Sequence, residues 1–99
     1  MTYEKINRSV DEISEWMIKQ RRDIHMYPES SRKEFRTSQK IIDILNELGI
    51  EVKTGYYNTG VVGIIKGNNP GKTIALRFDM DALEMDETTK THFNPKTKA

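Results

Sequence analysis

Acidic residues gather in one stretch of the sequence, GKTIALRFDMDALEMDE, which spans residues 71–87. An apolar, strand-like segment runs there directly into Asp79 and Asp81, and Asp86 follows a few residues later. Carboxylates at the end of a strand can bind a metal ion, attack a phosphorus atom or exchange a proton with a substrate. Acids at such a place are also commonly plain surface groups in water, so the neighbouring residues have to decide between these possibilities.

A calcium-binding loop of the EF-hand type is the first chemistry to consider. Asp79 and Asp81 would occupy the first and third positions of its twelve residues. Position six, however, is Glu84 where the sharp turn needs glycine, and position twelve is Lys90 where a bidentate glutamate is needed. These mismatches argue against a calcium loop.

Phosphoryl transfer is the second chemistry. The segment IALRFDMD resembles the strand of haloacid-dehalogenase-type phosphatases, in which Asp79 would be the nucleophile and Asp81 a general acid or base. Leu83 stands where that family usually has threonine or valine, and the family also needs a downstream lysine and an acidic pair. This interpretation remains an alternative.

The first element expected before the acidic stretch is a long amphipathic helix. Its apolar face recurs at spacings of three and four residues, and we expect the helix to run from about Tyr3 to His25 or Met26. It should end there because Pro28 disfavours helical geometry at the residue before it. The face consists of Ile6, Val10, Ile13, Met17, Gln20 and Ile24.

A second helix is expected after residues 31–36, SSRKEF. Ser31 and Glu34 have the spacing of a capping box, and Gly49 is placed to close the helix in the left-handed conformation. We expect this helix to form a hairpin with the first. Its apolar face consists of Phe35, Ser38, Ile41, Ile42, Leu45 and Leu48.

Three short strands should follow Gly49. Ile50, Val52 and Thr54 alternate with polar residues, residues 61–66 are the run VVGIIK, and residues 73–79 are TIALRFD. The turn-forming sequences GYYNTG and GNNPGK separate them. The predicted fold class is therefore an α/β fragment: an N-terminal helical hairpin packed on a three-stranded antiparallel meander.

The middle strand also predicts self-association. Its successive apolar side chains must point to both faces of the sheet, whereas the helical hairpin can cover only one face. The uncovered face, which carries either Val61 or Val62, would leave an apolar patch that favours dimers or larger oligomers.

Length and composition limit the function classes. A chain of 99 residues forms one domain at most. Its net charge of +1 gives no electrostatic case for nucleic acid or an anionic membrane, and the neighbouring Arg21 and Arg22 are expected on a solvated face. The absence of cysteine and of an apolar N-terminal run predicts a cytoplasmic protein without a membrane partner.

Four blocks of the sequence carry a family resemblance. They are RRDIHMYPE (21–29), EFRTS (34–38), TGVVGIIKG (59–67) and GKTIALRFDMDAL (71–83). In this order they resemble the N-terminal part of the dinuclear metal-dependent amidohydrolases of the aminoacylase and carboxypeptidase family, which includes hippurate hydrolases and auxin-conjugate hydrolases. The resemblance implies that residues 1–99 are a single, incomplete N-terminal segment of a larger α/β, zinc-peptidase-like catalytic domain. The implied substrate is an N-acyl amino acid or a small peptide.

The resemblance also implies roles for the two aspartates. In the wider superfamily a His-x-Asp motif at this strand end supplies a metal ligand and the aspartate that orients it, and Asp79 and Asp81 stand at those places. They are the predicted catalytic residues. A full-length relative is expected to hold two divalent ions, zinc, manganese or cobalt, which activate water and polarise the amide carbonyl. Phe78 and Glu84 depart from the small residue and the proline that the family usually has there.

This chain lacks the family's later Cys-Gly-His-Asp and Glu-Glu motifs. A zinc-type site needs about three protein ligands, and the remaining candidates are weak: His25 is expected to have a structural role at a helix end, and His92 to be solvated. We therefore predict no metal site and no cofactor within the chain, which should be inactive alone. The alternative is a non-catalytic truncated product or a binding or oligomerising module.

Overall fold

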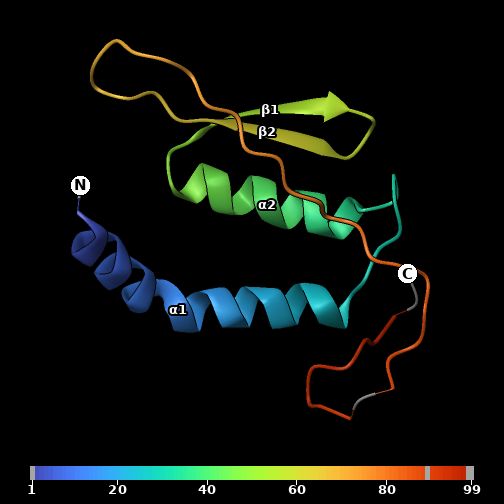
Figure 1. Cartoon of the computed structure of the whole chain (residues 1–99). Helices are drawn as coiled ribbons and strands as arrows, with labels where there is room; N and C mark the ends of the chain where they lie inside the picture. Colours follow the sequence, from blue (N-terminus) through green and yellow to red (C-terminus); the bar gives the residue numbers. More distant parts are fainter. Residues whose placement is uncertain (1, 89, 98–99) are drawn as a thin grey trace. The chain divides into compact units, whose positions relative to one another are not determined.

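The computed structural model describes residues 2–88 and 90–97 of the chain. It contains two helices, α1 (Tyr3–Met26) and α2 (Phe35–Glu47), followed by two strands, β1 (Glu51–Tyr56) and β2 (Gly60–Ile64) (Figure 1). The chain forms two compact units. One contains α1 and the segment from Met85 onward, and the other runs from Glu29 to Glu84 with α2 and both strands.

Helix α1 begins and ends where the sequence predicts. Its N-cap is Thr2, whose hydroxyl oxygen accepts a hydrogen bond from the backbone N–H of Lys5 at 3.3 Å. At the other end, the N–H of Tyr27 donates to the carbonyl of Ile24 at 3.2 Å, and Pro28 follows. None of the residues of α1 is buried, and its apolar face remains exposed at Ile6, Val10, Ile13 and Met17. No helix in the described part of the chain is long and apolar enough to cross a membrane.

Helix α2 has a different N-terminus from the predicted capping box. The helix begins at Phe35, so Glu34 is itself the N-cap, and its side chain makes no capping hydrogen bond. The prediction was wrong because Ser31 lies three residues too early to occupy that position. The C-terminal prediction is confirmed: Gly49 has a φ of +72°, and the N–H of Ile50 donates to the carbonyl of Leu45 at 3.0 Å.

The strands β1 and β2 form a two-stranded antiparallel sheet. Lys53 pairs with Val62 and Glu51 with Ile64, and the turn between the strands places Tyr57 and Asn58 at positive φ. Gly60, which opens β2, approaches the chain so closely that a Cβ there would lie 2.5 Å from the carbonyl oxygen of Tyr56. This position therefore requires glycine.

Helix α2 packs on one face of this sheet (Figure 1). A Cβ placed on Gly63 would lie 3.3 Å from Cδ1 of Leu45. The face of the sheet to which a side chain at position 63 would point is therefore the face that packs on α2. Since strand side chains alternate, Val62 and Ile64 point to the opposite face. The half-buried apolar residues of α2 and of the sheet face towards it are Ile41, Ile42, Ile44, Leu45, Val52 and Val61.

The third predicted strand is not formed. Residues 65–79 are described without any strand, so the predicted three-stranded meander is corrected to a two-stranded sheet. The physical reason is that a strand needs a partner edge as well as β propensity, and segment 73–79 lacks such a ladder here. The prediction of an α/β arrangement with helix α2 over an antiparallel sheet is confirmed in its coarse form.

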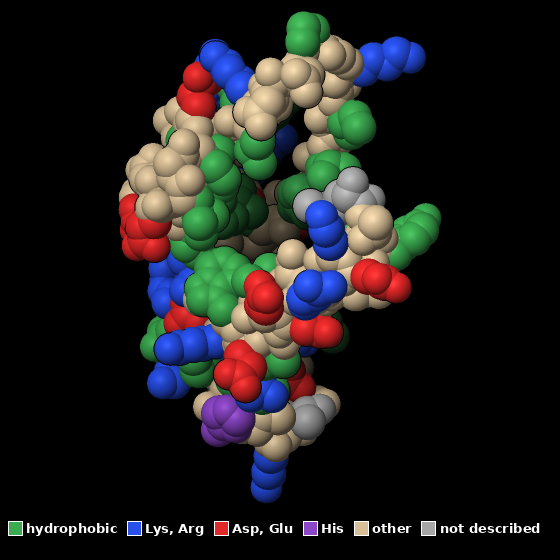
Figure 2. Space-filling model, turned by 90° about the vertical axis from the view of Figure 1, so that its left-hand side faces the viewer, with side chains coloured by type: hydrophobic (Ala, Val, Ile, Leu, Met, Phe, Trp, Pro, Cys, Tyr) green, Lys and Arg blue, Asp and Glu red, His purple; other side chains and the backbone are tan. Residues whose placement is uncertain are grey.

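The buried residues in the described part of the chain are polar rather than apolar. No apolar residue among them is buried, whereas Glu34, Thr37, Ser38 and Thr59 are. Figure 2 shows hydrophobic side chains reaching the surface of the molecule. Phe35 and Leu48, which the helical pattern assigns to the core, are more than half exposed. Much of the apolar surface predicted to be core is therefore uncovered.

Candidate functional site

The two predicted catalytic residues lie in the segment that follows β2. Asp79 forms an ion pair with Arg77, with 3.1 Å between Oδ1 of Asp79 and Nη2 of Arg77. Both side chains are largely exposed, that of Asp79 at 69% and that of Arg77 at 90%. Asp81 is exposed as well. An ion pair so open to solvent contributes little to stability, although it orients the Asp79 carboxylate.

A backbone hydrogen bond joins Ala82, the residue after Asp81, to the loop before α2. The N–H of Ala82 donates to the carbonyl oxygen of Glu29 at 2.8 Å. Asp81 therefore lies next to a residue that is held in place against the Glu29 loop. Phe78 and Glu84, where the sequence departs from the family pattern, lie in the same segment, and both are exposed.

Glu29 caps α2 from a distance in sequence. Its Oε2 accepts the N–H of Arg36 at 2.9 Å, and its Oε1 accepts the N–H of Thr37 at 2.6 Å. Partial burial raises the pKa of Glu29, but these two backbone hydrogen bonds and the positive charge of Arg36 outweigh it. The pKa of Glu29 is therefore below its ordinary value, and the residue is a carboxylate at neutral pH.

A buried polar network joins α2 to the hairpin turn. The hydroxyl of Ser38 donates to the carbonyl oxygen of Thr59 at 2.8 Å, and the hydroxyl of Thr59 donates to Oε1 of Glu34 at 3.5 Å. The hydroxyl of Thr37 also favours the charged form of Glu29. Its buried Oγ1 nevertheless makes no hydrogen bond of normal geometry to any described residue. The network holds the first turn of α2 against the loop between β1 and β2.

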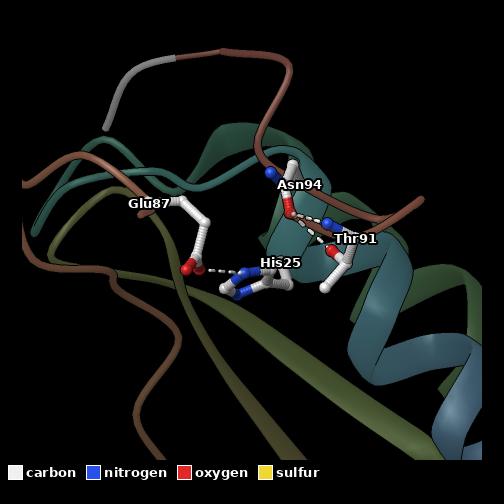
Figure 3. A network of polar contacts seen from close by, with 4 residues as sticks. All are labelled: His25, Glu87, Thr91 and Asn94. Carbon is white, nitrogen blue, oxygen red and sulfur yellow. Dashed lines mark hydrogen bonds and ion pairs between the residues drawn. The ribbon is translucent and has the colours of Figure 1, made fainter. Parts of the chain in front are cut away.

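The other unit contains the second polar contact of interest (Figure 3). Nε2 of His25, near the end of α1, lies 3.0 Å from Oε2 of Glu87, and both side chains are about two-thirds or more buried. The guanidinium of Arg22 lies 4.5 Å from the centroid of the Phe93 ring. The N–H of Lys96 donates to the carbonyl oxygen of Met26 at 2.6 Å. These contacts attach the segment from Met85 onward to the end of α1.

The same segment contains two local contacts. Oδ1 of Asn94 accepts hydrogen bonds from both the N–H and the hydroxyl of Thr91 (Figure 3). The ring of His92 packs edge to face against that of Phe93, with 5.0 Å between centroids. His25 therefore contacts a glutamate 62 residues away, rather than the backbone carbonyls that its place near a helix end led us to expect. His92 is exposed and also contacts a ring.

The residues described here do not fit a metal ion by themselves. Within residues 2–88 and 90–97, no three histidine, aspartate or glutamate side chains lie close enough together to hold one. Asp79 is directed to Arg77 rather than to a second acidic ligand. A metal site that uses this aspartate pair would need ligands from other residues.

Sequence reasoning missed the two glutamates that make the most specific contacts. Glu29 lies seven and eight residues before the amides that it caps, and Glu87 lies 62 residues after His25. Local capping patterns extend over about three residues, so neither contact leaves a signal in the sequence.

Comparison with known proteins places this sequence in a family. Thermostable carboxypeptidase 1 of Saccharolobus solfataricus is 50% identical over 96 residues, which are 96% of this chain and 24% of that protein. N-acetyl-L-cysteine deacetylase of Bacillus subtilis is 42% identical over 79% of this chain and 19% of its own length. N-acyl-L-amino acid amidohydrolase of Geobacillus stearothermophilus is 36% identical over 97% of this chain and 26% of its own length. No family model and no solved structure matches the chain.

These relatives are hydrolases of amide bonds, as the four sequence blocks predicted. The chain is homologous to the N-terminal part of this amidohydrolase and carboxypeptidase family. It spans about a quarter of the length of the relatives it matches.

Proposed function

We propose that this chain contributes the N-terminal part of a metal-dependent amidohydrolase domain that hydrolyses the amide bond of N-acyl amino acids or of small peptides. The observation that carries the proposal is the identity of 36% to 50% over almost the whole chain with an amidohydrolase and a carboxypeptidase. The named substrates of the relatives are N-acylated amino acids, which supports this substrate class.

Asp79 and Asp81 are the residues of this chain that we assign to the active-site rim. They stand at the end of segment 73–79, and the hydrogen bond from the N–H of Ala82 to the carbonyl of Glu29 joins the residue after Asp81 to the loop before α2. We assign Asp81 the role of orienting a neighbouring catalytic group, with Asp79 beside it. The two divalent ions of the family, zinc, manganese or cobalt, would bind through groups that the described residues do not supply.

The larger domain is part of the same proposal. Segment 73–79 has the composition of a third strand, and in the complete domain we propose that it forms one. The alternative function, a non-catalytic binding or oligomerising module, is supported by the uncovered apolar surface of the chain.

A chimera tests the proposed function. Residues 1–99 replace the matched quarter of thermostable carboxypeptidase 1, and hydrolysis of hippurate-type and other N-acyl amino acid substrates is measured with zinc, manganese or cobalt. We expect turnover by the chimera, no turnover by the isolated chain, and a loss of about 100-fold or more in the Asp81→Ala chimera.

Three results would contradict the proposal. A folded chimera without activity would remove the amidohydrolase assignment. Metal-dependent turnover by the isolated chain that is lost in Asp81→Ala would show that copies of this chain share ligands. Hydrolysis of small phosphomonoesters with magnesium that is lost in Asp79→Asn would favour the phosphatase alternative.

A further inference from the structure

Half-buried residues alternate with the two aspartates of the predicted site. Within residues 71–84, Met80 and Ala82 are half-buried, and all the others are exposed. Asp79 and Asp81 are therefore open to solvent, where a substrate can reach them. The residues on both sides of Asp81 are nevertheless partly covered by the rest of the chain, so its backbone is the part of this stretch that other residues can hold.

Glu29 connects the backbone at Asp81 to helix α2 through two kinds of contact. Its carbonyl oxygen accepts the N–H of Ala82 at 2.8 Å. Its carboxylate accepts the N–H groups of Arg36 and Thr37, at 2.9 Å and 2.6 Å. The N–H of Ala82 belongs to the planar peptide group that also contains the carbonyl of Asp81. The hydrogen bond to Glu29 therefore restrains the direction in which the chain leaves the aspartate.

The residues around Glu29 are held in turn. Pro28 precedes it and has a restricted φ, and in the turn that follows, the N–H of Lys33 donates to the carbonyl oxygen of Ser30 at 2.9 Å. The first turn of α2 is attached to the β1–β2 turn by the buried hydrogen bond from the hydroxyl of Ser38 to the carbonyl of Thr59. Glu29 therefore joins an exposed aspartate to the layer formed by α2 and the sheet.

We propose that Glu29 is a positioning residue for Asp81. The start of α2 fixes the carboxylate of Glu29, and the carbonyl of the same residue fixes the peptide group between Asp81 and Ala82. Glu29 acts through Asp81 and does not itself contact the substrate. A small displacement of an orienting group lowers the rate of the chemical step, so the loss of this support should be visible in catalysis. The inference rests on the proposed function, because that proposal is what gives Asp81 its catalytic role.

Amide hydrogen exchange in the full chain tests the link to Asp81 without any measurement of activity. Glu29→Ala removes both side-chain acceptors of the helix amides, whereas the conservative Glu29→Gln keeps one. Relative to the N–H of Ile42 inside α2, the N–H of Ala82 should exchange about 5-fold faster or more in Glu29→Ala, with a smaller change in Glu29→Gln. Ser38→Ala is the control, because it also weakens the attachment of α2. It should change the exchange of the two amides alike.

Kinetics of the chimera with thermostable carboxypeptidase 1 test the effect on catalysis. Glu29→Ala should lower kcat by about 10-fold or more and leave KM within about 2-fold, because the affected group acts in the transition state. Ser38→Ala should keep the kcat of the folded chimera, although both variants lower its stability. In the Asp81→Ala chimera, addition of Glu29→Ala should cause no further loss, because no aspartate side chain is then left to position.

The positioning role is wrong if Glu29→Ala and Ser38→Ala change the exchange of Ala82 alike, if Glu29→Ala leaves kcat unchanged, or if its loss adds to that of Asp81→Ala. Where Glu29→Ala does not fold, Glu29→Gln decides the same comparisons. Each of these results would leave the proposed function intact, because the wild-type chimera would still be active. A folded wild-type chimera without activity would remove the proposed function and this role together, whatever the exchange of Ala82 showed.

Discussion

Glu29 shows how one side chain can decide where a helix begins. The first N–H groups of a helix have no partner within it, and here one carboxylate accepts two of them, those of Arg36 and Thr37. A negative charge at this end is also favoured by the helix dipole. Because the pKa of Glu29 is lowered in the folded chain, its ionised form stabilises the fold.

Replacing Glu29 by glutamine should weaken the start of α2. At neutral pH we expect a loss of about 1 kcal/mol, the usual scale for a lost N-terminal cap. A carboxylate with a lowered folded pKa contributes stability above its unfolded pKa, and this contribution disappears as the pH falls through the folded value. The difference between the wild type and Glu29→Gln should therefore be present at pH 7 and shrink as the pH falls through the lowered pKa of Glu29. Urea denaturation followed by circular dichroism measures it.

Glu12→Gln is the control for this experiment, because Glu12 is an exposed residue in the middle of α1. It should have little effect at any pH. Equal losses in both variants, or a Glu29→Gln effect that does not shrink as the pH falls, would contradict the capping role.

At the scale of elements, α2 is fastened to the β1–β2 turn by polar contacts. The hydrogen bond from Ser38 to the carbonyl of Thr59 is buried, and the neighbouring Glu34 is buried with it. Further along the helix, α2 lies so close to β2 that a Cβ on Gly63 would be 3.3 Å from Cδ1 of Leu45. The helix and the hairpin should therefore lose their structure together rather than one after the other.

Ser38→Ala tests this attachment. The substitution leaves the buried carbonyl of Thr59 without the Ser38 donor, which costs about 1 to 3 kcal/mol. Ser31→Ala is the matched control, because Ser31 is exposed and does not cap α2. Thermal denaturation should give a lower midpoint for Ser38→Ala alone. An equally large loss in Ser31→Ala would support the capping box predicted from the sequence and would contradict the role of the Ser38–Thr59 hydrogen bond.

For the whole molecule, the balance between apolar surface and core decides its state of association. The sheet face opposite α2 carries Val62 and Ile64, and Val62 is 42% exposed. Together with the exposed side chains of Ile74, Leu76 and Phe78, this leaves the isolated chain with surface that favours contact with other copies. Self-association is the state that we expect when no larger partner is present.

Sedimentation velocity at several concentrations checks this expectation. The isolated chain should form dimers or larger oligomers, and Val62→Lys should shift it towards monomer, because a charge then lies on the uncovered sheet face. Tyr57→Asp is the control, because Tyr57 is 80% exposed in the turn between β1 and β2. A compact monomer at every concentration, with Val62→Lys and Ile65→Lys both harmless to folding, would show instead that the chain closes its own core.

The sequence by itself determined the features that depend on neighbouring residues. The limits of α1, the left-handed Gly49 after α2, the β1–β2 hairpin and the family blocks could all be recognised from local spacing. Only the tertiary structure decided the features that join distant residues. Glu29 rather than Ser31 caps α2, Glu87 pairs with His25, and residues 73–79 remain outside the sheet. The physical reason is that a periodic pattern reports which side chains share a face, whereas a cap, an ion pair or a strand ladder forms only where the fold supplies a partner at hydrogen-bonding distance.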